Sequence, residues 1–175
     1  MRILTYIFLL CVGLLYTAQA QMTEKGRTGT FALTNATIET VTNGTIQRGT
    51  LVISNGKIQD IGTNVTIPSG AITIDCSGLT IYPGMIDGGA QLGLSEVGSD
   101  DRTRDFNEIG DVIPHMQALT AVNPNSVLIP VTRVNGVTSS LALPTGGLFP
   151  GTAALINLWG YTPDQMYAGF KGVVV

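Results

Sequence analysis

The sequence has little charge and almost none of the residues that bind transition metals. Of its 175 residues, 12% are charged, one is a histidine and two are cysteines. A catalytic zinc site takes about three protein ligands, so a single imidazole does not build one. The lone histidine, His115, follows Pro114, and a surface or capping role is the simplest interpretation of it.

The first 20 residues have the pattern of a secretory signal peptide. They contain one early cation, an apolar run from Ile3 to Leu15, and small residues at Ala18 and Ala20. This predicts cleavage near Ala20 and a secreted or periplasmic protein. The run is shorter than the roughly 20 apolar residues that span a bilayer, so we expect no membrane attachment once the signal is removed.

The cysteine content and the net charge limit the disulfides and the partners that the exported chain can have. Cys11 and Arg2 leave with the signal peptide, so Cys76 remains without a partner for an internal disulfide and is expected to be a small core residue. The whole chain has 9 Lys and Arg against 12 Asp and Glu, a net charge of −3. This balance excludes nucleic acid and anionic membranes as partners.

Residues 21–29 are expected to form a linker, and residues 30–81 a β-rich module. Four runs rich in Thr, Ile and Val suggest strands because of their near period-two alternation. Asn43-Gly44 and Asn55-Gly56 lie between such runs, where a tight hairpin turn needs positive φ. We therefore expect a small antiparallel module. The runs are "TFALTNATIETV", "TIQRGTLVISNGKIQDIG", "AITID" and "LTIY".

The sequence pattern of residues 82–175 differs from that of residues 30–81 and predicts alternating strands and helices. A helix is expected from about Pro124 to Val134, ended near Asn135-Gly136, and the strands "VTSSLAL" and "TAALINL" follow it. This order is typical of a β/α barrel or a parallel sheet. We expect the two strands to pair in parallel, with the helix on their outer face. We also expect Thr80 to Asp87 to run from the first module into the second without a break.

An acidic stretch, "GLSEVGSDDRTRDFNEIGD", lies between the first predicted barrel strand and this helix. Its composition predicts a solvated loop. A site for a hard cation is the alternative, built from carboxylates of the stretch, but their spacing does not match a calcium loop with its central glycine and terminal glutamate. The carboxylates in question are Asp100, Asp101, Asp105 and Glu108.

The segment "IDCSGLTIYPGMID" resembles the entrance to the amidohydrolase superfamily of metal-dependent hydrolases, including imidazolonepropionase-like and dihydroorotase-like members. The downstream "RVNGVTSSLALPTGG" resembles the helix, Gly-Val-Thr turn and second barrel strand of such enzymes. The resemblance covers roughly residues 31 to 160. It implies an α/β fold in which a small β-sandwich-like composite domain, 30–81, leads into the first βα units of an incomplete TIM-type barrel, 82–175.

The resemblance also implies a reaction, the metal-dependent hydrolysis of non-peptide carbon–nitrogen bonds, with zinc or another divalent metal as cofactor. After "PGMID" the family pattern continues with two histidines, which would fall on Gly89 and Gln91. Glycine has no donor atom and a neutral amide is a poor ligand for zinc. We therefore expect no metal and no catalytic residue in this chain. Asp87 either orients a neighbour or binds substrate, or it has the commoner role of initiating a turn at the two glycines that follow it.

Length supports the same expectation, because a complete eight-stranded barrel takes about 250 residues. We expect a truncated or non-catalytic module whose uncovered apolar faces self-associate or meet a partner. That partner is either a catalytic amidohydrolase-like protein or a missing C-terminal part. Two alternatives stay open: the front of an active amidohydrolase with metal ligands beyond residue 175, and a non-enzymatic β-rich binding module.

Overall fold

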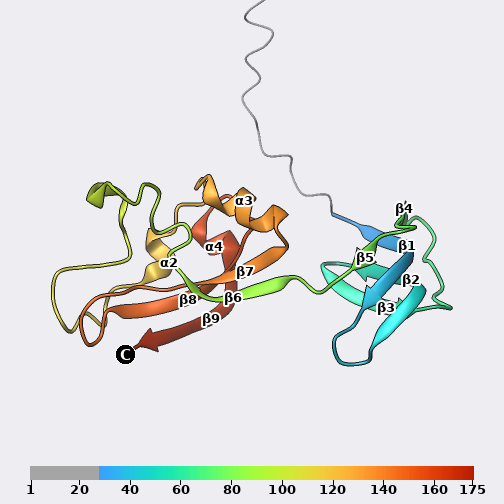
Figure 1. The fold of residues 1–175 in the computed structure, drawn as a ribbon, viewed down its shortest axis with the longest axis horizontal. Helices are drawn as coiled ribbons and strands as arrows, with labels where there is room; N and C mark the ends of the chain where they lie inside the picture. Colours follow the sequence, from blue (N-terminus) through green and yellow to red (C-terminus); the bar gives the residue numbers. More distant parts are fainter. Residues whose placement is uncertain (1–27) are drawn as a thin grey trace, which may run out of the picture. The chain divides into compact units, whose positions relative to one another are not determined.

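The computed structural model describes residues 28–175 (Figure 1). The predicted signal peptide, residues 1–20, and nearly all of the predicted linker lie outside the described residues. The chain divides into two compact units between Ile81 and Tyr82. Within residues 28–175 no helix is long and apolar enough to cross a membrane.

The first unit is a β-sheet in the strand order β3-β2-β1-β4, with β5 also paired to β1. The predicted hairpins are present: β1, β2 and β3 form an antiparallel meander. Asn55 and Gly56 have φ values of 52° and 72°, as the turn between β2 and β3 requires. The strands are β1 (Thr30–Glu39), β2 (Thr45–Ser54), β3 (Lys57–Gly62), β4 (Ile72–Asp75) and β5 (Thr80–Ile81).

The prediction that this module is purely antiparallel is wrong, because β4 and β5 both run parallel to β1. The connection 63–71 carries the chain from β3 to the opposite side of β1, where β4 runs in the direction of β3. The core below the sheet contains Ala36, Ile38 and Leu51. Cys76 is a buried free cysteine in this core, as predicted.

The second unit is a four-stranded sheet in the order β6-β7-β8-β9 with short helices. Strands β6 and β7 are parallel, and the connection between them contains η1, α2 and α3. The elements are β6 (Met85–Ala90), η1 (Asp101–Thr103), α2 (Ala118–Ala121), α3 (Leu128–Val134), β7 (Val137–Ala142), β8 (Gly151–Asn157), α4 (Pro163–Met166) and β9 (Tyr167–Val174).

The predicted helix is confirmed in its second half. Helix α3 begins at Leu128 and ends at Val134, and Gly136 then has a φ of 91°, which glycine adopts without strain. Helix α3 packs against β7. Buried side chains of α2, α3, β8 and α4 share one core, which includes Leu119, Ile129, Ile156 and Met166.

Two expectations about the strands are corrected. Strands β7 and β8 are antiparallel rather than parallel, because the short loop between them holds no helix, and a parallel connection needs about a dozen residues or more. The segment from Thr80 to Asp87 is not one run, since β5 ends at Ile81 and β6 begins at Met85 in a different sheet. Pro83 lies in the break and has no N–H to donate to a ladder.

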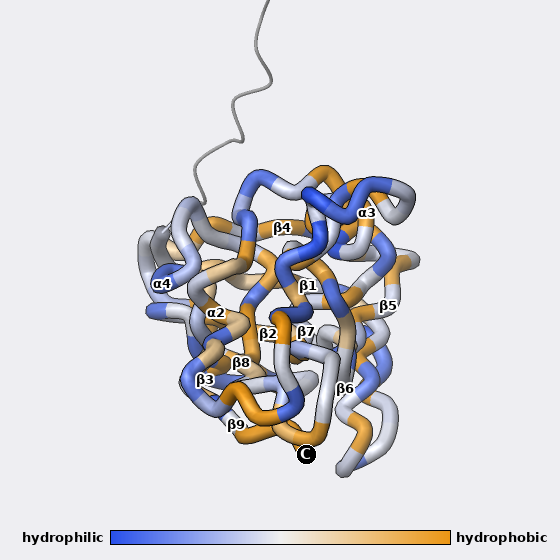
Figure 2. The backbone as a smooth tube through the Cα atoms, turned by 90° about the vertical axis from the view of Figure 1, so that its left-hand side faces the viewer, coloured by the Kyte–Doolittle hydropathy of each residue, from blue (hydrophilic) through white to orange (hydrophobic). Residues whose placement is uncertain are grey.

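The second unit therefore contains one parallel strand–helix–strand connection followed by two antiparallel strands. The fold is α/β with a β-rich N-terminal module. Its last strand was not predicted. The end of β9 is apolar and exposed, with Val173 66% accessible, and is orange beside the C-terminus in Figure 2.

Candidate functional site

The carboxyl ends of β6 and β7 lie side by side and hold a small polar cluster. Asp87 of β6 is opposite Ser140 of β7 in the parallel register. The Ser140 hydroxyl donates to Oδ2 of Asp87 at 3.3 Å, and the backbone N–H of Gly89 donates to Oδ1 at 3.1 Å. The predicted turn at the two glycines is not present, because β6 continues through them to Ala90. Asp87 instead binds these neighbouring groups where the pairing of β6 with β7 is irregular, between Asp87 and Ala90.

Gln91 follows β6 and extends the cluster toward the loop after β7. Its Nε2 lies 3.5 Å from the hydroxyl oxygen of Thr145. The backbone joins the same loops, because the N–H of Leu143 donates to the carbonyl of Ala90, and the N–H of Thr145 donates to the carbonyl of Phe106. The amide of Gln91 therefore belongs to a hydrogen-bonded connection between two loops.

Gly89 is exposed, and its backbone conformation leaves room for a side chain. A Cβ placed on it would lie 3.4 Å from Cδ2 of Leu143, an ordinary contact, and its φ is not in the left-handed region. Packing therefore does not require glycine here. Neither the space nor the backbone explains why this position lacks a side chain.

The donors at this edge do not fit the divalent metal centre that the resemblance implies. They are one carboxylate, one neutral amide and the hydroxyls of Ser140 and Thr145, a set without imidazole or thiolate. Within the described part of the chain, no three His, Cys, Asp or Glu side chains gather in a way that could hold a metal ion. The metal content of the protein stays a prediction.

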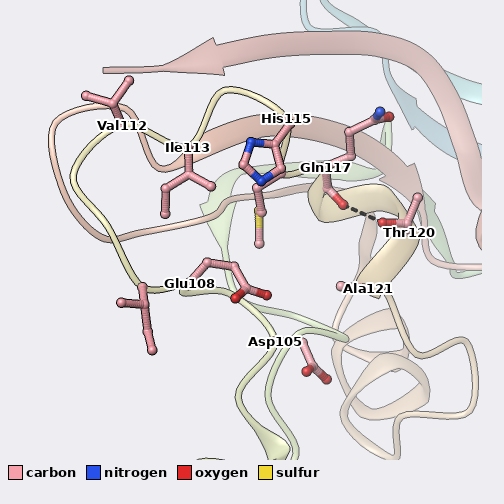
Figure 3. Close-up of a pocket in the computed structure, with 10 residues that line it drawn as sticks. Asp105, Glu108, Val112, Ile113, His115, Gln117, Thr120 and Ala121 are labelled. Atoms are coloured by element: carbon pink, nitrogen blue, oxygen red, sulfur yellow. Dashed lines mark hydrogen bonds between the residues drawn. The ribbon is translucent and has the colours of Figure 1, made fainter.

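His115 lies elsewhere, on the segment before α2. It is exposed and lines an open pocket of about 400 Å³, shown in Figure 3, together with Asp105 and Glu108. Neither Gly89 nor Gln91 lines this pocket. The structure therefore does not bring the lone histidine together with the two family ligand positions.

The four carboxylates considered for a hard cation are separated by their partners. Asp100 pairs with Arg102 at 2.8 Å and Asp101 pairs with Arg104 at 2.6 Å. Hydrogen bonds from the Arg102 side chain, and then from its backbone N–H, hold the pKa of Asp100 below its usual value. Asp105 and Glu108 line the pocket instead.

Sequence reasoning missed Ser140 and Thr145 as members of the polar cluster. Ser140 is fully buried, which its place in "VTSSLAL" did not reveal. Their positions in the sequence could have indicated this role. Ser140 lies in the predicted strand "VTSSLAL" and Thr145 follows it, and that strand was expected to be in the same sheet as the "PGMID" strand. Carboxyl ends of parallel strands meet at one edge of a sheet, where ligands bind in such folds.

Comparison with known proteins gives two informative relatives. No family model matches the chain. A dihydroorotase from Geobacter metallireducens is 46% identical over 37 residues, which cover 21% of this chain and 9% of that protein. The crystal structure of an amidohydrolase from Thermotoga maritima is similar with a TM-score of 0.74 and 28% identity, over 79% of this chain and 36% of that one.

The structural likeness covers 79% of this chain, which is more than either of its two units contains. It therefore includes residues of both units. The chain spans about a third of the Thermotoga structure, so the activity of the whole relative is not transferred with the fold. Sequence and structure agree on the relationship. Both comparisons relate the chain to the amidohydrolase superfamily.

Proposed function

We propose that this chain is a non-catalytic amidohydrolase-like module that acts as a scaffold or as a partner of a catalytic amidohydrolase-like protein. The observation that carries the proposal is the pair Gly89 and Gln91 at the two positions where the family has histidines. Gly89 offers no side-chain donor, and the Gln91 amide is directed to Thr145. The first two ligands of a metal centre are thus replaced.

The chemical consequence concerns the attacking water. A divalent metal lowers the pKa of bound water from about 15.7 to about 7, which makes hydroxide available at neutral pH. The cluster at β6 and β7 has one carboxylate, Asp87, and both of its oxygens already accept hydrogen bonds. No step of amide hydrolysis is assigned to these residues.

The proposal includes export. The signal-peptide pattern of residues 1–20 supports a secreted or periplasmic location, and the deficit of basic residues agrees with a partner that is neither nucleic acid nor membrane. The proposed partner is a catalytic amidohydrolase-like protein or further sequence of the same kind of barrel. Exposed apolar residues of the second unit, such as Ile86 and Val134, support the need for a partner surface.

A second function has one observation in its favour. Asp87 and Ser140 form an ordered polar pair at the carboxyl ends of parallel strands, where barrel enzymes have their active sites. The chain would then be the front part of an active hydrolase of carbon–nitrogen bonds, with metal ligands beyond residue 175. Histidines on later barrel strands of a longer product of the same gene would favour this function.

Elemental analysis of the purified chain tests the first proposal. We expect less than stoichiometric zinc, manganese or iron, and no hydrolysis of a panel of cyclic and linear amides. The double variant Gly89→His, Gln91→His should fold, because Gly89 has room for a side chain. It should also stay inactive, because two histidines are fewer than the about three ligands of a catalytic site.

Two results of these measurements would contradict the proposal. One or more tightly held metal ions per chain, lost when Gln91 or His115 is replaced by alanine, would show that these residues ligate a metal. Hydrolysis of any amide by the unmodified chain, abolished by a chelator, would likewise contradict the non-catalytic proposal.

A further inference from the structure

A pocket of about 400 Å³ lies in the second unit, between the acidic segment that begins at Asp105 and the segment that leads into α2 (Figure 3). Its volume is within the range of small-molecule sites, about 300–1,000 Å³. It is lined neither by Gly89 nor by Gln91. It is therefore a cavity apart from the polar cluster on which the proposed function rests.

One part of the pocket is apolar. Ile113 is 5% exposed, and Met116 and Ala121 are half-buried. The backbone holds these residues in place, because the N–H of Ile113 donates to the carbonyl of Phe149 and the carbonyl of Met116 accepts from the N–H of Thr152. The apolar surface is thus tied to the β8 side of the unit and is present before any ligand binds.

The other part is negative. In Figure 3 the carboxylates of Asp105 and Glu108 lie on the same side of the pocket, opposite the end of the Gln117 side chain. Neither carboxylate takes part in the ion pairs found among residues 28–175, which join Arg102 to Asp100 and Arg104 to Asp101. Both residues are exposed, and ionised carboxylates are acceptors only, so a ligand that donates to them replaces bound water.

The other cations of this unit, Arg133 and Lys171, take no part in these ion pairs and bond to neutral groups. Arg133 donates to the carbonyl of Leu158 at 2.7 Å and stacks on Trp159. Lys171 donates to Oε1 of Gln117 at 3.2 Å and lies over the ring of Tyr167. The pocket therefore places two carboxylates beside an apolar surface, while Lys171 contacts Gln117 on the opposite side.

We propose that this pocket binds a small organic cation, in which an ammonium or guanidinium group meets Asp105 and Glu108 and an apolar chain or ring covers Ile113 and Met116. A charged donor to a carboxylate forms the stronger kind of hydrogen bond. The apolar contact supplies affinity that a bare metal ion does not obtain. This site goes beyond the proposed function and does not depend on whether the chain is catalytic.

Titration of the full chain with three matched probes tests the proposal: hexylamine, hexan-1-ol and hexanoate share an apolar chain and differ in charge. Calorimetry gives the affinity, and amide NMR signals of residues 105–121 locate the binding. We expect hexylamine to bind and to shift these signals, hexan-1-ol to bind at least about fivefold more weakly, and hexanoate not to bind. Added salt should weaken only the amine.

Isosteric variants distinguish binding in this pocket from a general attraction of the cation to the acidic segment. Asp105→Asn and Glu108→Gln should each weaken hexylamine binding by about fivefold and leave hexan-1-ol unchanged. Asp111→Asn is the matched control, because Asp111 belongs to the same acidic segment but does not line the pocket. Equal binding of amine and alcohol overturns the proposal. So does an equal loss in Asp111→Asn, or a lack of signal shifts in residues 105–121 at millimolar hexylamine.

Discussion

Ser140 lies opposite Asp87 on the neighbouring parallel strand, and its hydroxyl donates to Oδ2 of that carboxylate at 3.3 Å. Ser140 is fully buried. A hydrogen bond to a charged group that is partly removed from water contributes more than an exposed one. This pair therefore contributes to holding β6 and β7 together beside Gly89 and Gln91.

Replacing Ser140 tests the importance of the pair for stability. Ser140→Ala should lower the free energy of unfolding of the second unit by about 1–2 kcal/mol. Ser140→Val should cost about 1–3 kcal/mol, because its extra bulk enters a fully packed position. Urea unfolding followed by the fluorescence of Trp159 reports on this unit, since it holds the one tryptophan of the chain. Ser139→Ala, whose exposed hydroxyl bonds to Asn157, is the control and should change little.

Arg133 is predicted to stabilise the second unit through Trp159. Its guanidinium carbon is 4.8 Å from the centre of the indole ring, and Nη1 donates to the carbonyl of Leu158 at 2.7 Å. Arg133→Gln should lower the free energy of unfolding by about 1–2 kcal/mol. The emission of Trp159 should change in the folded state, because the guanidinium over its ring is lost.

The control for Arg133 is Arg102→Gln. The Arg102 side chain is 90% exposed and pairs with Asp100 alone, so its loss should cost less than about 1 kcal/mol and leave the tryptophan emission unchanged. An unchanged emission and stability in Arg133→Gln would show that the stacked arrangement does not persist in solution.

The first unit should respond to acid through Asp75. Hydrogen bonds from the side chain of Asn35, and then from the side chain and backbone of Ser77, hold the pKa of Asp75 below its usual value. A pKa that is lower in the folded state favours folding above the unfolded-state pKa, and this contribution is lost as the pH falls through the folded-state pKa. We therefore expect the first unit to lose stability below about pH 4.

Two variants should raise the pKa of Asp75, as measured by NMR titration of its carboxyl carbon. Asn35→Gly should have the larger effect, and glycine tolerates the φ of 60° at this position. Ser77→Ala should have a smaller effect. Ser69→Ala is the control, because its hydroxyl is not among the donors to Asp75. A pKa that stays unchanged in Asn35→Gly would contradict the assignment.

Helix α3 leads us to expect self-association of the chain. Val127, Val131 and Val134 repeat at the spacing of one helix face and are 71%, 58% and 82% exposed. Sedimentation velocity should show concentration-dependent association, and the double variant Val131→Lys, Val134→Lys should reduce it. Val41→Lys, at an exposed turn of the first unit, is the control. A compact, monodisperse monomer without dye-binding apolar surface would contradict this expectation.

Local rules in the sequence determined the turns, the helix end and the missing metal ligands. Asn55-Gly56 and Gly136 were predictable because positive φ is a property of one or two residues and does not depend on distant partners. The absence of histidine at Gly89 and Gln91 can be read from the sequence by aligning the "PGMID" motif and counting two and four residues beyond Asp87. The β-rich character of residues 30–81 followed from alternation within each strand.

Tertiary structure alone decided how the strands pair and which side chains meet. The antiparallel pairing of β7 and β8, and the parallel pairing of β4 with β1, depend on where each connection returns the chain. The burial of Ser140 against Asp87, and the gathering of Asp105, Glu108 and Ile113 around one pocket, join residues from separate segments. Such contacts arise from the packing of whole elements around a shared core, and local propensity carries no information about them.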